Sequence, residues 1–139
     1  MREIKNIVLH CTATQPTATV ESILRFWRTS RKWRDPGYHY IIEFNGNVRN
    51  LQPEEKPSNG VAGHNLDSIH VSYIGGIDRE GKPEDTRSSE QRIAMKGLVQ
   101  KLHQRYPTAI ILGHRDFPNV PKACPSFDVR SWLKEENVL

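Results

Sequence analysis

Two histidines stand where apolar segments of the chain give way to polar loops, and a cysteine follows in the second of these loops. His10 follows the apolar run Ile4–Leu9, and His114 follows the run Ala109–Leu112 after a single glycine. Cys124 comes ten residues after His114, in the same loop. Two neutral imidazoles and a thiolate are typical zinc ligands, and a hydrolytic zinc site needs three protein ligands with an open fourth position. Such a site would stay positively charged and would activate a water molecule for hydrolysis.

The surroundings of Cys124 favour a thiolate, but the spacing of the three residues leaves other interpretations open. Lys122 precedes the cysteine, and Ser126 can cap a helix directly after it; a lysine and a helix N-terminus both stabilise a thiolate. A histidine at a strand end ordinarily forms only a hydrogen bond, and the spacing here is not a standard local zinc signature. Cys11 could instead pair with Cys124 in a disulfide, although the chain is expected to be cytoplasmic. In an extended chain the Cys11 side chain points away from that of His10, so Cys11 is not expected to share the metal.

The elements that must position these residues predict an α/β fold with one mixed sheet and about three helices. Strands are expected at residues 4–9, 38–44, 47–51, 68–77 and 109–112, with Asn45-Gly46 as a hairpin turn. Helices are expected after Thr19, after Ser88, which opens a capping box with Gln91, and after Ser126. If the first and last strands are parallel neighbours, His10 and His114 reach the same edge of the sheet.

Length and composition indicate one domain over residues 1–139. The chain has a net charge of +4 and only two cysteines, which excludes a disulfide scaffold. No apolar stretch is long enough for a membrane span or a signal peptide, so we expect a cytoplasmic protein at synthesis without membrane insertion. The three tryptophans (Trp27, Trp33 and Trp132) fall at apolar positions. They favour a core over a nucleic-acid surface, and no specific nucleic-acid partner is expected.

Five segments of the chain together carry a family resemblance. They are Val8-Leu9-His10-Cys11-Thr12-Ala13-Thr14, Gly37-Tyr38-His39-Tyr40-Ile41-Ile42, Tyr73-Ile74-Gly75-Gly76-Ile77-Asp78, Gly113-His114-Arg115-Asp116 and Pro121-Lys122-Ala123-Cys124-Pro125-Ser126-Phe127-Asp128. With them the chain resembles the zinc-dependent N-acetylmuramoyl-L-alanine amidases of the T-odd bacteriophage lysozyme type, which share a fold with peptidoglycan recognition proteins. The resemblance runs over nearly the whole chain, and its last segment is the most specific.

The resemblance implies a catalytic site and a substrate. It implies that His10, His114 and Cys124 bind Zn²⁺, and it adds Tyr38 and Lys122 as catalytic residues that stabilise the charge developing on the attacked carbonyl. The reaction implied is hydrolysis of the amide between N-acetylmuramic acid and L-alanine in peptidoglycan, by a monomer that acts on the cell wall once released. A non-catalytic peptidoglycan-binding module of the same fold is the alternative, and the presence of Cys124 argues against it.

The chain departs from the family pattern at two positions. Family members often carry a substrate-side histidine where an ungapped alignment places Gly60, and a gapped alignment would place His64 there, so His64 is a candidate substrate contact. His70 follows Ser68-Ile69, at a position where family members commonly carry a glycine, and the sequence assigns it no role. His39 is expected to be a buried, hydrogen-bonded residue. Asp116 and Asp128 are alternative partners for a ligand histidine.

Overall fold

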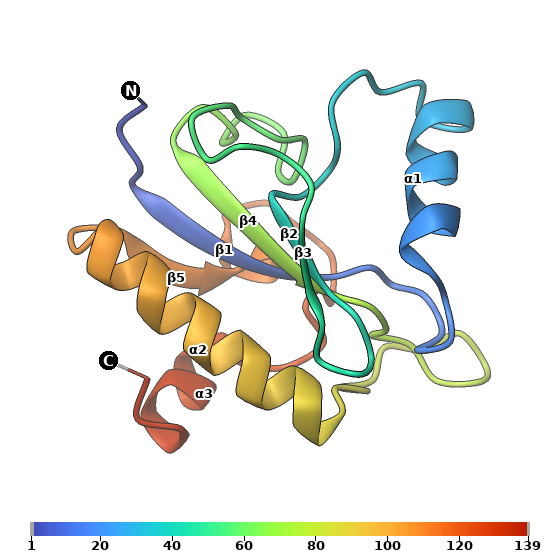
Figure 1. The fold of residues 1–139 in the computed structure, drawn as a ribbon. Coiled ribbons are helices and arrows are strands. Elements are labelled where there is room, and N and C mark those ends of the chain that lie inside the picture. The colour runs from blue at the N-terminus through green and yellow to red at the C-terminus, as the bar shows by residue number, and fades with distance from the viewer. Residues whose placement is uncertain (1, 139) are drawn as a thin grey trace.

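A five-stranded mixed sheet forms the centre of the computed structural model, which describes residues 2–138 (Figure 1). The strand order is β3-β2-β4-β1-β5, and only the β2–β3 pair is antiparallel within this sheet. The strands are β1 (Asn6–Cys11), β2 (Tyr40–Ile42), β3 (Val48–Asn50), β4 (Ser68–Tyr73) and β5 (Ile110–Gly113). The helices are α1 (Val20–Thr29), α2 (Ser89–Arg105) and α3 (Val129–Glu135), with a short 3₁₀ turn at His114–Asp116. The predicted α/β class and element order are confirmed.

Helix α1 covers one face of the sheet (Figure 1). Thr19 caps it as predicted, because its side chain accepts a hydrogen bond from the backbone of Ser22, whose side chain returns the contact. Val20, Ile23 and Trp27 point inward at helical spacing and pack against the sheet. Burial of this apolar stripe packs α1 against Ile41 of β2 and Ile74, the residue that follows β4.

Helices α2 and α3 cover the opposite face (Figure 1). Ser88 and Gln91 form the predicted capping box of α2. The buried Gln91 amide also donates to the carbonyls of Ile42, the last residue of β2, and of Ile74, which directly follows β4. Ile93, an expected core position of this helix, is instead 74% exposed because it lies off the stripe that faces the sheet.

Strand β1 extends two residues further than predicted, and this changes the place of His10. His10 lies inside the strand rather than after it. Alternation then directs Ile7, Leu9 and Cys11 toward α2 and α3, whereas Val8 and His10 face the other side. His10 therefore points from the sheet toward the side that α1 covers.

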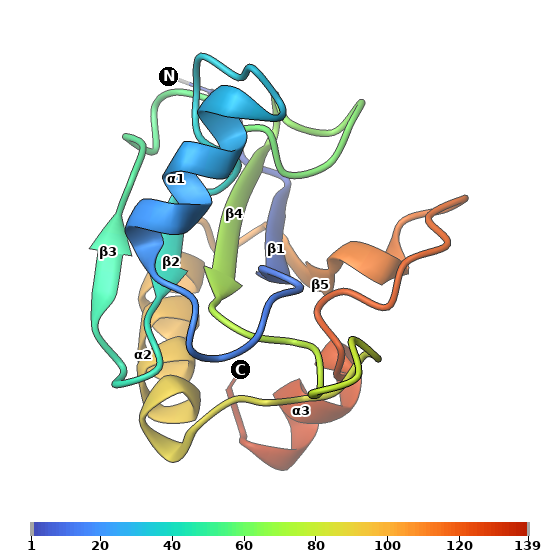
Figure 2. The same cartoon turned by 90° about the vertical axis from the view of Figure 1, so that its right-hand side faces the viewer.

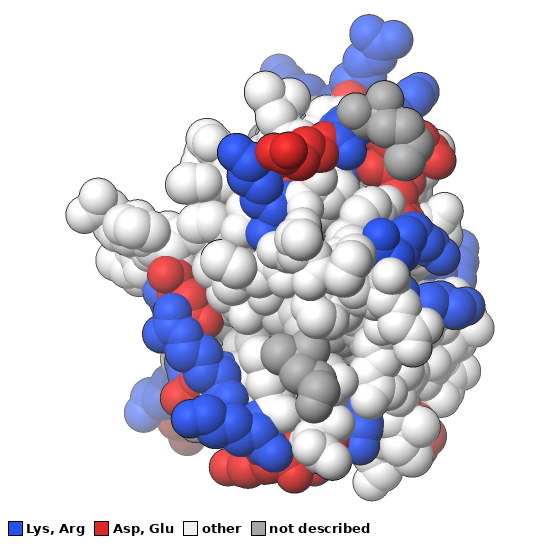
Figure 3. All heavy atoms as spheres, turned by 90° about the vertical axis from the view of Figure 1, so that its left-hand side faces the viewer, with Lys and Arg blue, Asp and Glu red and all other residues white. Residues whose placement is uncertain are grey.

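Surface features agree with a modest net charge. On the face shown in Figure 3, lysine and arginine side chains lie in separate groups interleaved with acidic residues. Trp27 and Trp132 are buried and Trp33 is half-buried, as their apolar positions predicted. Over residues 2–138, no helix combines the length and the apolar character that a membrane crossing requires.

Candidate metal centre

Parallel pairing of β1 and β5 places His10 and His114 side by side. The register aligns Leu9 with Gly113, so the next residue on each strand is a histidine. The centroids of the two imidazole rings are 4.9 Å apart. The carboxyl side chain of Asp116 accepts a hydrogen bond from the Gly113 backbone and so holds the turn that carries His114. The predicted neighbourhood of the two strands, and of the two imidazoles, is confirmed.

Cys124 completes a three-residue cluster. Its Sγ lies 3.8 Å from Nδ1 of His10, and one ligand atom from each of His10, His114 and Cys124 lies within 4.8 Å of the other two. Ordinary zinc bond lengths in a tetrahedral site put a nitrogen and a sulfur ligand about 3.6 Å apart. The donor types and their separations therefore fit a zinc ion bound by three protein ligands.

The protonation of the cluster suits a cation. Burial lowers the pKa of His10 well below its usual range. Burial, together with nearby Lys122, lowers the pKa of His114 to about 4. Both imidazoles are therefore neutral near pH 7, with a lone pair free for a metal. A hydrogen bond with the Cys11 side chain, together with burial, raises the pKa of the Cys124 thiol, so metal binding must displace a proton from it.

Cys11 lies beside the cluster without belonging to it. Its buried side chain packs with Ile7 and Leu9 on the far side of β1, as strand alternation predicted. Its backbone N–H donates to Sγ of Cys124 over 3.2 Å. Both cysteines are free thiols, so the alternative of a disulfide between them is not formed in this structure.

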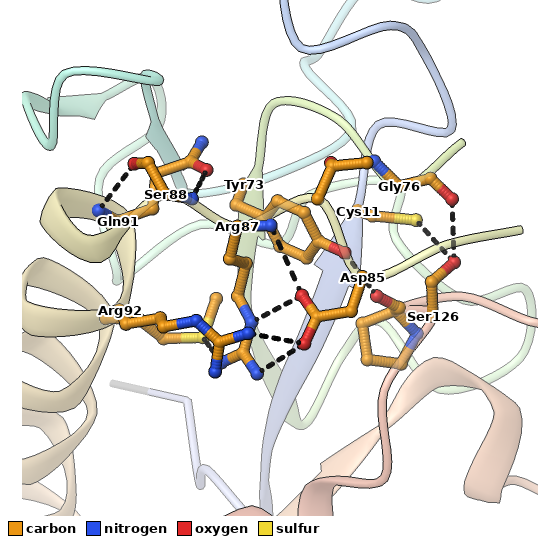
Figure 4. Close-up of polar contacts among 12 residues, drawn as sticks. Cys11, Tyr73, Gly76, Asp85, Arg87, Ser88, Gln91, Arg92 and Ser126 are labelled. Carbon is orange, nitrogen blue, oxygen red and sulfur yellow. Dashed lines mark hydrogen bonds and ion pairs between the residues drawn. The ribbon is translucent and has the colours of Figure 1, made fainter. Parts of the chain in front are cut away.

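The segment that carries Cys124 is anchored to β4 and to the loop that follows it. The buried hydroxyl of Tyr73 donates to the carbonyl of Pro125 over 2.7 Å. The hydroxyl of Ser126 donates to the carbonyl of Gly76 over 2.9 Å, next to the Cys11 sulfur (Figure 4). These two bonds fix the backbone on the C-terminal side of Cys124.

Two sequence predictions near this segment are corrected. Ser126 does not cap α3, because its φ of 70° turns the chain and its hydroxyl is used by Gly76. Asp128 is the N-cap instead, and its carboxylate accepts from the backbone of Ser131. Asp128 thereby has a capping role, and Asp116 supports the His114 turn through the backbone rather than through the imidazole.

The cluster opens into a cavity of about 450 Å³. Its lining residues come from the loop after β1, from α1 and from the segment that follows β5, and Figure 2 shows how these parts of the chain are arranged. Its walls include Trp27, Trp33, Arg31 and Lys122, in addition to the three cluster residues. The walls combine aromatic surface with basic groups, which suits a ligand that is partly apolar and partly anionic.

Tyr38 and Lys122 both line this cavity. The Tyr38 ring centroid is 5.0 Å from that of His10, and its hydroxyl donates to the carbonyl of Cys11 over 3.2 Å. Burial raises the pKa of Tyr38, so its phenol stays protonated and can donate a hydrogen bond. Lys122 is exposed on the rim. The sequence predicts a strand that begins at residue 38, but β2 begins two residues later, so Tyr38 lies outside it.

His64 lies in a neighbouring cavity rather than in the one that holds Tyr38 and Cys124. Its ring packs on Phe117 at a centroid distance of 4.5 Å, and it shares its cavity with His114 and Lys122. Sequence reasoning missed the position that contacts the cluster directly. His70, to which no role was assigned, is buried with Nδ1 2.9 Å from Nε2 of His10. The departure from the family pattern at His70 was the signal in the sequence.

His39 confirms its prediction as a buried, hydrogen-bonded histidine. Its Nε2 contacts the carbonyl of Lys56 over 2.7 Å, and its Nδ1 contacts the Ser58 hydroxyl and accepts from the backbone of His70. Burial lowers the pKa of His39 to about 4. These hydrogen bonds hold the loop before β4 against the sheet, and His39 is not part of the three-residue cluster.

The fold defines a class. The endolysin of the Thermus scotoductus MAT2119 bacteriophage Ph2119 has the same fold, with a TM-score of 0.84 and 24% identity, over 98% of this chain and 86% of that one. Drosophila PGRP-LB, a peptidoglycan recognition protein, also has this fold, with a TM-score of 0.76 and 16% identity over 96% of this chain and 81% of that chain. The architecture is therefore that of amidases and peptidoglycan recognition proteins.

The family is shown by the sequence. Residues 1–127 match the family model of N-acetylmuramoyl-L-alanine amidase. The endolysin of Escherichia phage T7 is 34% identical over 134 residues, which cover 96% of this chain and 87% of that protein. This chain belongs to the N-acetylmuramoyl-L-alanine amidase family. The resemblance first noted in five short segments is thus confirmed over nearly the full length.

Proposed function

We propose that this chain is a zinc-dependent amidase that cleaves peptidoglycan between N-acetylmuramic acid and L-alanine, and that residues 1–139 form its catalytic domain. The observation that carries the proposal is the complete set of donors in His10, His114 and Cys124, which meets at one end of a cavity. A binding module needs no metal ligands, whereas hydrolysis of an amide needs a polarised carbonyl and an activated water. A bound zinc ion would supply both of these.

The chain's own residues supply the remaining charge stabilisation. The Tyr38 phenol is protonated and lies against the His10 ring, and by turning its single O–H away from the carbonyl of Cys11 it can donate to an oxyanion in the cavity. The ammonium of Lys122 lines the same cavity and adds a positive charge that favours the tetrahedral intermediate over the neutral substrate. Tyr38 and Lys122 therefore act on the oxygen of the scissile amide.

The cavity walls fit a muropeptide. Trp27 and Trp33 offer apolar surface, and Arg31 stacks 5.6 Å from the Trp33 ring at the cavity wall, where it can pair with a carboxylate of the peptide stem. His64, one cavity further along and connected through His114 and Lys122, is placed to contact a more distant part of the substrate. A T7 endolysin is among the relatives, so we propose that the chain acts as a lysin on the cell wall.

The reaction is tested by the ends it creates. Purified cell walls incubated with the protein should lose turbidity and gain new alanine N-termini, with no new reducing sugar ends. Tyr38→Phe and Lys122→Met should each reduce the rate by about 100-fold, the order of loss seen when one oxyanion donor is removed. His103→Gln, half-buried on α2 and outside the cavity, is the matched control. Binding of walls without new alanine ends would identify a binding module and overturn the proposal.

A further inference from the structure

The imidazole of His70 lies next to the His10 ring, on the side of that ring away from Cys124. His70 lies on β4, two residues before Ser72, which is the register partner of His10 on β1. Its side chain is fully buried and points to the same side of the sheet as that of His10. Nε2 of His10 and Nδ1 of His70 are 2.9 Å apart, a hydrogen-bond distance. This contact uses the His10 nitrogen that does not face Cys124.

The direction of that hydrogen bond follows from the partners on the far side of His70. The backbone N–H of Val61 can only donate, and it donates to Oδ1 of Asn65 over 2.8 Å. Oδ1 is therefore an acceptor, and Nε2 of His70, 2.9 Å away, must donate to it. A neutral imidazole has one donor and one acceptor nitrogen, so Nδ1 of His70 accepts and Nε2 of His10 donates.

The consequence is a fixed tautomer at His10. With its proton on Nε2, His10 presents the lone pair of Nδ1, the atom that lies 3.8 Å from Sγ of Cys124. A metal needs that lone pair. The hydrogen bonds that link Val61, Asn65, His70 and His10 thus keep Nδ1 of His10 unprotonated even without a bound metal.

Gly60 makes room for this arrangement. A Cβ added at Gly60 would lie 2.3 Å from Nδ1 of His70, far inside contact distance, so only glycine fits beneath the ring. In the resemblance described above, Gly60 stands where members often carry a histidine, and His70 stands where they commonly carry a glycine. These two positions are in contact in the structure: β4 carries the imidazole of His70, and Gly60 in the preceding loop has no side chain beside it.

We propose that His70 is a positioning residue of the metal centre, which fixes the tautomer and the ring orientation of His10 and thereby strengthens zinc binding. The proposal rests on the proposed zinc site, because it concerns one of its ligands. A partner of this kind is worth roughly 10–100-fold in metal affinity. His70 itself is fully buried and does not line the cavity, so its role is to position His10 and not to contact substrate.

Zinc affinity, measured by competition with a chelator, tests the consequence. His70→Ala should weaken zinc binding by roughly 10–100-fold. His70→Asn should recover most of the loss, because its Oδ1 falls near the position of the imidazole Nδ1 and can accept from His10. His103→Gln, on α2 and outside the cavity that the cluster lines, is the matched control. It should keep the wild-type affinity. Equal losses for His70→Ala and His70→Asn, or no loss for either, would overturn the proposal.

The tautomer is tested without metal. In the metal-free protein, ¹⁵N chemical shifts of His10 should report a proton on Nε2, and His70→Ala should shift that ring toward a mixture of tautomers. An unchanged tautomer in His70→Ala would contradict the role given to His70 even if zinc binds well. A wild-type chain with the fixed tautomer but no zinc affinity would instead contradict the proposed function, so the two failures are distinguishable.

Discussion

Arg87 is the buried cation that joins the loop after β4 to the segment carrying Cys124, and Arg87→Met tests its contribution to stability. Its guanidinium donates to both carboxylate oxygens of Asp85, over 2.9 and 3.0 Å, as Figure 4 shows. The same group lies 3.5 Å from the ring centroid of Phe127, three residues after Cys124. Its side chain is only 2% exposed. Methionine keeps the apolar contact with the ring but removes the charge.

The magnitude follows from what remains after the substitution. Removal of one partner from a buried ion pair costs about 3–5 kcal/mol, because the other charge loses its compensation. Asp85 is 24% exposed and keeps an ion pair with Arg92 at 3.0 Å. The cost should therefore fall at the lower limit, and we expect Arg87→Met to reduce the free energy of unfolding by about 3 kcal/mol.

Urea unfolding at neutral pH measures this value, and Arg92→Met is the matched control. Arg92 binds the same carboxylate at the same distance, but its side chain is 45% exposed. Exposed pairs contribute about 1 kcal/mol or less. If the two variants lost the same free energy of unfolding, burial would not govern the strength of this anchor and the reasoning would be wrong.

Two further predictions concern backbone crowding and pH. Gly76→Ala would combine a φ of 103° with a Cβ only 2.4 Å from Sγ of Cys11, so unfolding measurements should show a loss of about 3 kcal/mol. Gly81→Ala, at φ 85° with open space around it, should lose only about 1 kcal/mol, and equal losses would contradict the crowding argument. The pKa of His39 is about 4 in the folded chain and about 6.5 when unfolded, so the unfolded chain binds an extra proton between these values. Stability should fall as the pH drops through this window, by about 2 kcal/mol between pH 7.5 and 5 from His39 alone. Urea midpoints that fall equally in wild type and His39→Asn would contradict it.

Local signals in the sequence predicted the elements well. The caps at Thr19 and Ser88 and the turn at Asn45-Gly46 act over a few neighbouring residues, so their residue types were enough to place α1, α2 and the hairpin. Strand ends were predicted less accurately. β1 continues through His10 and Cys11 because Ser72 and Tyr73 of β4 pair with them, and such a partner is not visible from the neighbours in sequence.

The three residues of the cluster could be predicted from the sequence, but the residues that support them could not. His10 and His114 stand beside apolar segments that the order of elements allows to pair in parallel, Cys124 follows in the loop after His114, and the structure brings the three together. His70 depends on the exact distance between two strands and on the empty space at Gly60, ten residues earlier in the chain. Such fit between distant side chains is a property of tertiary packing, which no local pattern records.

We propose that His10, His114 and Cys124 form a zinc centre on which amide hydrolysis depends. The most direct test is the zinc content of purified wild type, Cys124→Ser and Cys11→Ser, measured together with release of alanine N-termini from cell walls. Cys11→Ser is the paired variant, because that residue lies next to Cys124 but is not one of the three cluster residues, and serine keeps a hydrogen-bonding group there. A zinc centre at these three residues predicts about one zinc per chain and full activity in wild type and Cys11→Ser, and loss of both in Cys124→Ser. Retention of zinc and activity by Cys124→Ser would contradict it.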